Sequence, residues 1–200
     1  MQVTAIKKTQ QTKSGYEVYV DGGYAFTLSP DALLDTKLVV GQQLDVQQLQ
    51  AYQILATRDK AYGLTLSYVA RRMRSRWELT NYFSRKGYDE SMSQQLLERL
   101  ERIGMVNDAK FAEAWVHNRR MLKQASRHRL VQELRQKHVD DDVIEQALSG
   151  DQVNEHTLLR TLIVRKRKQT RYQDDRKLIQ YLARQGFRYE DIVAAIKDAP

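Results

Sequence analysis

Three segments of the chain, residues 65–76, 117–129 and 160–173, carry basic side chains and no acidic residue. Ammonium and guanidinium groups pair with phosphates and carboxylates, so these segments suit an anionic partner. A helix face that serves only solubility usually mixes both signs, and the absence of acids argues against that simpler interpretation. We expect the binding surface to include Arg71, Arg72, Arg74, Arg76, Arg119, Arg120, Lys123, Arg127, Arg165, Lys166, Arg167, Lys168 and Arg171.

The net charge of +8 lies entirely in one part of the chain. Residues 1–64 hold six of the 33 basic and six of the 25 acidic residues, so residues 65–200 carry the whole excess. Reversing Arg119, Arg120 and Lys123 to glutamate is expected to weaken anion binding. The fold should survive this change, because we expect the three side chains to be exposed.

The basic segments belong to a repeating unit. Three copies align at offsets of 51 and 48 residues, and each predicts two helices, a turn and a third helix. Arg72, Lys123 and Arg171 share one column of this alignment, so we expect them on one face. Two further pairs that align are Arg119 with Arg167 and Arg120 with Lys168.

Each copy repeats the signals of its middle helix. The helix is expected to begin at an N-cap residue and to turn two hydrophobic side chains, four positions apart, toward the core. These residues are Ser75, Leu79 and Phe83, then Ser126, Leu130 and Leu134, then Asp174, Leu178 and Leu182. In the first copy Glu78 completes a capping box with Ser75.

The turn after the middle helix calls for a residue in the left-handed conformation, which glycine adopts most easily. Gly87 and Gly186 suit this position, whereas His138 stands there in the second copy, which leaves the geometry of that turn open. The third helices are in register through Leu96 and Leu97, Ala147 and Leu148, and Ala195 and Ile196.

Residues 1–60 predict strands instead of repeats. The stretches 3–6, 17–20 and 24–28 are rich in β-branched and aromatic residues, and Asp21-Gly22-Gly23 is a tight-turn signal. Ser29 before Pro30 marks a helix start.

We therefore expect a mainly α protein, with three tandem three-helix repeats in a curved, elongated array after a small N-terminal β-hairpin or meander. The assigned ranges are 1–60 for the N-terminal extension, 61–106 for repeat 1, 107–153 for repeat 2 and 154–200 for repeat 3.

Residues with catalytic or metal-binding potential are few. The chain has no cysteine, its four histidines lack metal-ligand spacing, and it has no glycine-rich phosphate loop. The acids 140–142 precede a helix and are better explained as N-terminal helix residues than as metal ligands. We expect no enzyme activity, cofactor or metal. The aromatic residues expected to pack in the core are Trp77, Tyr82, Phe83, Phe111 and Trp115.

The N-terminus carries Lys7 and Lys8 instead of an apolar signal sequence, and no apolar run approaches the roughly 20 residues of a membrane span. A soluble, cytoplasmic protein is expected, and repeats of this size favour a monomer.

Three strings resemble the RecX regulators of the bacterial RecA recombinase. They are AYGLTLSYVARRMRSRWEL at 61–79, GMVNDAKFA at 104–112 and LRQKHV at 134–139. The resemblance covers residues 61–200, and the segment 1–60 resembles an N-terminal extension found in some members.

The resemblance implies a non-enzymatic role in DNA repair and recombination. RecX proteins lie in the groove of the RecA–single-stranded DNA filament and suppress its ATPase, strand-exchange and coprotease activities. The expected partners are thus the RecA filament, the single-stranded DNA within it and free DNA, with no membrane. Two alternatives stay open, a direct DNA-binding protein similar to helix-turn-helix domains and an unrelated interaction scaffold.

Overall fold

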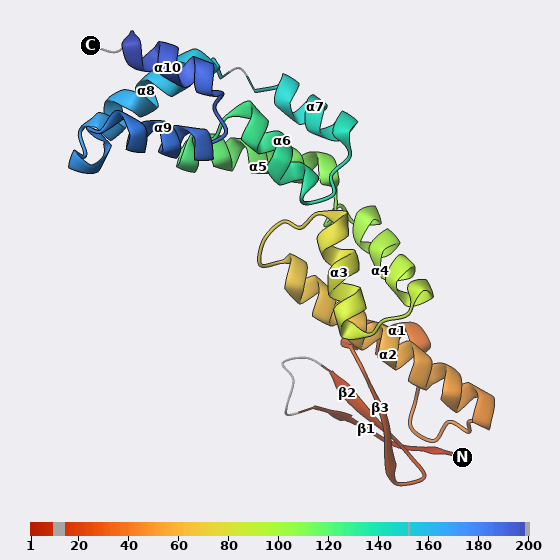
Figure 1. Cartoon of the computed structure of the whole chain (residues 1–200). Helices are drawn as coiled ribbons and strands as arrows, with labels where there is room; N and C mark the ends of the chain where they lie inside the picture. Colours follow the sequence, from red (N-terminus) through yellow and green to blue (C-terminus); the bar gives the residue numbers. More distant parts are fainter. Residues whose placement is uncertain (10–14, 152, 199–200) are drawn as a thin grey trace. The chain divides into compact units, whose positions relative to one another are not determined.

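The computed structural model describes residues 1–9, 15–151 and 153–198. The chain forms two compact units, Met1–Arg72 and Met73–Pro200 (Figure 1). In the described part of the chain, no helix is long and apolar enough to cross a membrane.

The first unit begins with a three-stranded antiparallel sheet in the order β1-β2-β3. Its strands are β1 (Val3–Lys8), β2 (Tyr16–Val20) and β3 (Gly23–Leu28). Asp21 and Gly22, which join β2 to β3, both have positive φ angles, as a tight hairpin turn with two left-handed residues requires. The predicted strands and turn are confirmed.

Two helices complete the first unit. α1 (Pro30–Thr36) has Ser29 as its N-cap, as predicted, and Asp59 of α2 (Val46–Val69) accepts hydrogen bonds from the Ser29 amide (2.6 Å) and hydroxyl (2.8 Å). The N-terminal half of α2 packs against the sheet through the buried Ala56. α2 runs without a break through residue 60, where we placed the border of repeat 1, so the assigned ranges stay a prediction.

The second unit is helical. Its elements are α3 (Arg76–Lys86), α4 (Glu90–Arg102), α5 (Asp108–Lys123), α6 (Arg127–Arg135), α7 (Asp141–Ser149), α8 (Glu155–Arg167), the 3-10 turn η1 (Thr170–Tyr172), α9 (Asp175–Arg184) and α10 (Tyr189–Lys197). The mainly helical fold class is confirmed. Asp141 and Asp142 lie in the first turn of α7, where their negative charges interact favourably with the positive end of the helix dipole.

The middle helices α3, α6 and α9 begin where the sequence predicts. The side chains of Ser75, Ser126 and Asp174 each accept a hydrogen bond from the backbone amide three residues later, and Glu78 completes the predicted capping box. The predicted hydrophobic pairs are confirmed, because each is at most 1% exposed: Leu79 and Phe83, Leu130 and Leu134, and Leu178 and Leu182.

The turns after these helices share one geometry despite their different residues. Gly87, His138 and Gly186 have φ angles of 71°, 52° and 88°. His138 thus takes the left-handed conformation predicted for glycine. This conformation is sterically unfavourable for a residue with a Cβ, so contacts of His138 elsewhere in the fold must offset the free-energy cost. The following residues, Val139 and Phe187, are buried in the cores of repeats 2 and 3.

The aromatic residues divide into two groups. Phe83 and Phe111 are buried, and Trp115 packs against the core of repeat 2, as predicted. The prediction is wrong for Trp77, which is 37% exposed and stacks on the imidazole of His138, with ring centroids 4.4 Å apart. Helical spacing could not separate the two groups, because the partner of Trp77 is a turn residue of another repeat.

Candidate functional site

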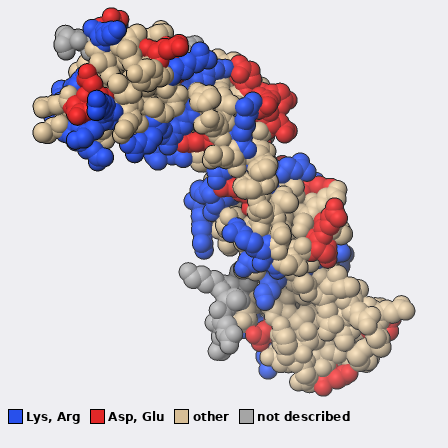
Figure 2. All heavy atoms as spheres, in the orientation of Figure 1, with Lys and Arg blue, Asp and Glu red and all other residues tan. Residues whose placement is uncertain are grey.

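The basic side chains of the second unit do not form one uniform surface. Figure 2 shows Lys and Arg gathered over the part of the molecule that contains α5, α8 and α9, while the sheet unit displays few of them. The three basic segments differ in how many of their cations have an acidic neighbour, and this difference determines which of them can serve an external partner.

The first basic segment spans the border between the two units. Arg71 and Arg72 are exposed in the turn after α2 and belong to the first unit, whereas Arg74 and Arg76 belong to the second. Arg76 forms an ion pair with Glu101 at 3.0 Å. Because Arg72 lies in a different unit from Lys123 and Arg171, their common face stays a prediction.

In the second segment, Arg119 forms an ion pair inside repeat 2. Its guanidinium lies 2.6 Å from Glu133 and stacks over the indole of Trp115. Glu133 also accepts hydrogen bonds from the Trp115 indole (3.0 Å) and from Arg129 (3.0 Å). Burial alone would raise the pKa of Glu133, but the hydrogen bonds from Arg129, Arg119 and Trp115 together lower it below its ordinary value.

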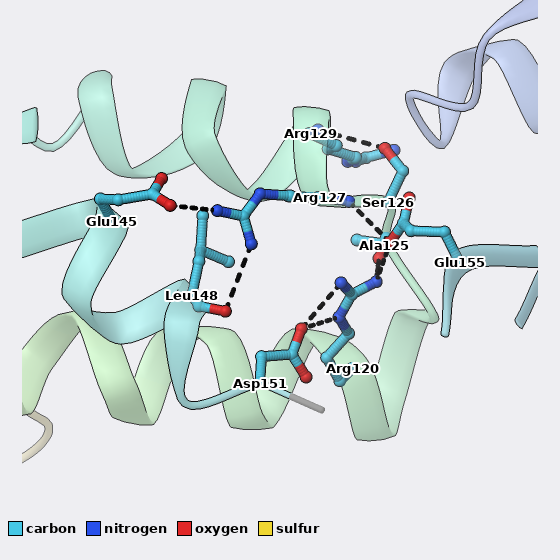
Figure 3. Close-up of polar contacts among 9 residues, drawn as sticks. All are labelled: Arg120, Ala125, Ser126, Arg127, Arg129, Glu145, Leu148, Asp151 and Glu155. Atoms are coloured by element: carbon cyan, nitrogen blue, oxygen red, sulfur yellow. Dashed lines mark hydrogen bonds and ion pairs between the residues drawn. The ribbon is translucent and has the colours of Figure 1, made fainter. Parts of the chain in front are cut away.

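Arg120 departs most clearly from its predicted role as an exposed binding residue. Its side chain is 8% exposed and lies 2.8 Å from Asp151 and 2.7 Å from Glu155 (Figure 3). It also donates to the carbonyl oxygen of Ala125, just before the N-cap of α6. Arg120 is therefore a buried cation that ties α5 to the chain entering α8, and the expectation that it is exposed and safely reversed is wrong.

Arg127 continues the same cluster on α6. It donates to Glu145 (2.7 Å) and to the carbonyl of Leu148 (3.2 Å), and its backbone amide donates to Glu155 (3.0 Å) (Figure 3). Lys123, by contrast, is exposed and has no acidic partner among the described residues. Within the described part of the chain, Lys123 is thus the one of the four predicted binding residues in this segment whose charge is unopposed.

In the third segment two cations form ion pairs, Arg160 with Asp198 and Arg167 with Asp175. Arg167 bonds to the carbonyl of Gln173 (2.6 Å) and to the carboxylate of Asp175. The remaining predicted cations have no acidic partner in the described part of the chain: Arg165, Lys166, Lys168 and Arg171.

Two tyrosines accompany these cations, and sequence reasoning missed both. The ammonium of Lys166 lies 4.6 Å from the ring centre of Tyr181 and 5.3 Å from that of Tyr172, and the guanidinium of Arg171 lies 5.7 Å from the latter. The tyrosine at the end of the third basic segment was the available signal, since it directly follows Arg171.

The repeats of the second unit contact one another through a recurrent pairing. The hydroxyl of Ser75, N-cap of α3, donates to the carbonyl of Lys137 in the turn of repeat 2 (3.0 Å), and the Lys137 ammonium lies 2.8 Å from Glu78. In the same way, the amide of Ser126, N-cap of α6, donates to the carbonyl of Gln185 in the turn of repeat 3 (3.1 Å). Each turn therefore docks on the helix start of the preceding repeat.

The two contacts differ in how closely the turn approaches. A Cβ on Gly186 would lie 2.5 Å from the Ser126 hydroxyl and 2.7 Å from the Arg129 Cβ, so only glycine fits. Arg129 also donates to the carbonyl of Arg184. At the other contact, Asp108 accepts a hydrogen bond from the Arg76 amide (2.8 Å). Burial raises the pKa of Asp108, an effect that this hydrogen bond partly opposes.

A cavity of about 370 Å³ lies between α6, α8 and the start of α10. Its wall combines Leu159 and Phe187 with His128, His156 and charges of both signs, so it does not select an anion. In the described ranges, no group of three or more His, Asp or Glu side chains is placed to hold a metal ion.

Comparison with known proteins identifies the fold. Residues 61–100 match the family model described as RecX, first three-helix domain, and residues 107–148 match RecX, second three-helix domain. A crystal structure of regulatory protein RecX shares the fold, with a TM-score of 0.73 and 24% identity over 98% of both chains. A crystal structure of RecX from Lactobacillus salivarius has a TM-score of 0.58 and 22% identity over 70% of this chain and 95% of that one.

Relatives of known sequence agree with the family models. Regulatory protein RecX of Bacillus pumilus (strain SAFR-032) is 29% identical over 202 residues, which cover 98% of this chain and 77% of that protein. Regulatory protein RecX of Amycolatopsis mediterranei (strain U-32) is 39% identical over 133 residues, which cover 64% of this chain and 76% of the relative. Given this identity and coverage, together with the matches to both three-helix domains, the chain belongs to the RecX family.

Proposed function

We propose that this chain is a non-enzymatic regulator, mainly an inhibitor, of a RecA recombinase. It binds in the groove of the RecA–single-stranded DNA filament and suppresses ATPase, strand-exchange and coprotease activity. The observation that carries the proposal is a set of cations on a RecX fold that have no acidic partner among the residues the structure describes, led by Lys123, Arg165 and Lys168. Such cations suit the phosphates and acidic surfaces of a filament.

The repeats supply a physical reason for filament binding. Each repeat offers a separate contact, and linked contacts gain affinity through effective concentration without any single strong site. A filament presents the same protomer surface at regular intervals, which a tandem array can contact more than once. We retain the ranges 61–106, 107–153 and 154–200 as the proposed contact modules.

The test is a RecA ATPase assay on single-stranded DNA with increasing amounts of the full chain. We expect ATP hydrolysis to fall as the protein is added, and we expect tighter binding to the filament than to naked DNA or RecA alone at matched salt. Unchanged hydrolysis together with equal affinity for naked duplex would instead identify a direct DNA-binding protein. Binding to none of the three would indicate an unrelated scaffold.

A further inference from the structure

Lys166 and Arg171 of repeat 3 have no carboxylate partner among the described residues, whereas Arg119 and Arg120 of repeat 2 form ion pairs. Arg119 and Arg120 face carboxylates at 2.6–2.8 Å, so most of their field is cancelled within the protein. Lys166 and Arg171 instead lie over tyrosine rings. A ring positions a cation through its quadrupole without removing the net charge, and its hold is weak enough for a stronger anion to compete.

Arg167 holds the backbone of the segment that carries these cations. Its guanidinium donates to the carbonyls of Tyr172 (3.4 Å) and Gln173 (2.6 Å) and pairs with Asp175 at the start of α9. The backbone of η1 is therefore bound to the end of α8 before any ligand arrives. A surface that is already ordered loses less conformational freedom on binding.

The aromatic content of this surface is as informative as its charge. Tyr172 and Tyr181 have ring centroids 5.1 Å apart, and both rings are half-buried. Between residues 165 and 172 there is no aliphatic side chain. Tyrosine and arginine are common in protein–protein interfaces too, but those interfaces have apolar centres and are depleted in lysine. Single-stranded nucleic acids bind surfaces that combine cations of both kinds with aromatic rings.

We propose that the end of α8 and η1 form a contact site for a single strand of DNA. Arg165, Lys168 and Arg171 bind backbone phosphates, and Tyr172 provides a stacking face for a base when the Arg171 side chain turns from the ring to a phosphate. The inference rests on the proposed function in that it names the part of the chain that meets the DNA of the filament, while the RecA protomers are contacted elsewhere.

The test measures the binding of the full chain to a fluorescein-labelled oligothymidylate by anisotropy, over a series of salt concentrations. Lys168→Glu with Arg171→Glu should weaken binding by about tenfold or more and flatten the logarithmic salt slope by about 1.4, since each phosphate contact to a single strand contributes about 0.7. The charge-matched control is Arg102→Glu with Lys110→Glu, at exposed positions outside repeat 3. We expect this control to keep the parental slope.

A second variant separates stacking from charge. Tyr172→Leu keeps an apolar side chain against the core of repeat 3 but removes the ring, and we expect binding to weaken by about five- to tenfold with the salt slope preserved. Circular-dichroism melting curves check that each variant is folded. The double variant Lys168→Gln with Arg171→Gln removes both charges without reversing them, so it should weaken oligothymidylate binding less than the double glutamate variant does.

Two results would overturn the inference. If both charge-reversed proteins lose affinity equally, only net charge matters and the site does not exist. If oligothymidylate binding is intact in Lys168→Glu with Arg171→Glu but binding to DNA-free RecA is lost, the surface serves an acidic protein face. Strand binding through this site without any effect on RecA ATPase would support the inference and reject the proposed function, so the two failures are distinguishable.

Discussion

The junction between repeats 1 and 2 and the junction between repeats 2 and 3 share a design but not its chemistry. In both, a turn carbonyl accepts a hydrogen bond from an N-cap serine of the preceding repeat: Lys137 from Ser75, and Gln185 from Ser126. The first junction uses the serine hydroxyl and the second uses the serine amide. The turn carbonyl is thus the common element, and the serine atom that meets it differs between the two junctions.

The side chains around the two contacts also differ. At the first, His138 accepts a left-handed backbone and stacks on Trp77. At the second, Gly186 brings the turn against Ser126, and the buried Arg120 anchors the chain that enters repeat 3. The first junction therefore combines a ring contact with the ion pair between Lys137 and Glu78, and the second combines close backbone approach with the buried Arg120.

The largest effect should come from Arg120→Ala. Removing this guanidinium leaves Asp151, which is 9% exposed, without its ion-pair partner, and the expected loss in the free energy of unfolding is about 3–5 kcal/mol. Urea denaturation measures it. The matched control is Arg160→Ala, whose partner Asp198 is exposed, with an expected cost of about 0–1 kcal/mol. Equal costs for the two variants would contradict a buried anchor.

Gly186→Ala should follow in size. The new Cβ meets the Ser126 hydroxyl at 2.5 Å and the backbone must stay left-handed, so we expect a loss of about 2–4 kcal/mol. Gly87→Ala has the same backbone requirement but open space around the Cβ, and should cost only about 1–2 kcal/mol. The Gly186→Ala variant should therefore melt at a lower temperature than the Gly87→Ala variant. Equal melting temperatures would show that the turn at Gly186 does not pack closely against Ser126.

Acid should act in opposite directions at Glu133, inside repeat 2, and at Asp108, at the junction between repeats 1 and 2. The pKa of Glu133 is lowered in the fold, so its stabilising effect is present above its unfolded pKa and is lost as the pH falls through the folded pKa. Glu133→Gln should cost about 1–2 kcal/mol at neutral pH and remove this part of the acid sensitivity.

Asp108 is the control for this titration. Its pKa is raised, so its ionisation opposes folding as the pH rises through the folded pKa. Asp108→Asn keeps an acceptor for the Arg76 amide and should not destabilise the protein at neutral pH. A comparable loss in both variants, measured by urea denaturation across the acid range, would disprove the opposite signs.

The smallest effect is the coupling between His138 and Trp77. His138→Gly relieves the left-handed strain but loses the stacking, so the two changes should nearly cancel. In a Trp77→Ala background there is no stacking to lose, and the same substitution should stabilise the protein by about 0.5–1.5 kcal/mol. A double-mutant cycle measures this coupling energy. A value near zero would mean that the stacked rings do not hold the turn.

The sequence predicts the interior of each repeat well because the interactions there are local. N-caps such as Ser126 act within one helical turn, and the spacing of Leu130 and Leu134 follows from helix geometry alone. The partners of Arg120 could not be predicted, because Asp151 and Glu155 are 31 and 35 residues away. An acid-free stretch of sequence therefore does not imply an acid-free surface.

Helical spacing failed for Trp77 for a related reason. A helix face that lies beneath the turn of the next repeat carries large side chains just as a core face does, so both give the same pattern. The pairing of Ser75 with Lys137 and of Ser126 with Gln185 was the missing information. It becomes visible only when the turns of one repeat are seen against the helix starts of another.

The serine pairing also determines how the second unit responds to mechanical load. The hydroxyl of Ser75 accepts from the Glu78 amide and donates to the Lys137 carbonyl, so one atom both starts α3 and holds repeat 2. A force that separates the two repeats therefore pulls on the first turn of α3 as well, and bending the junction requires fraying a helix. Strain at this junction therefore passes from repeat 2 into the start of α3, whereas at the second junction the Ser126 amide, and not its capping hydroxyl, makes the contact.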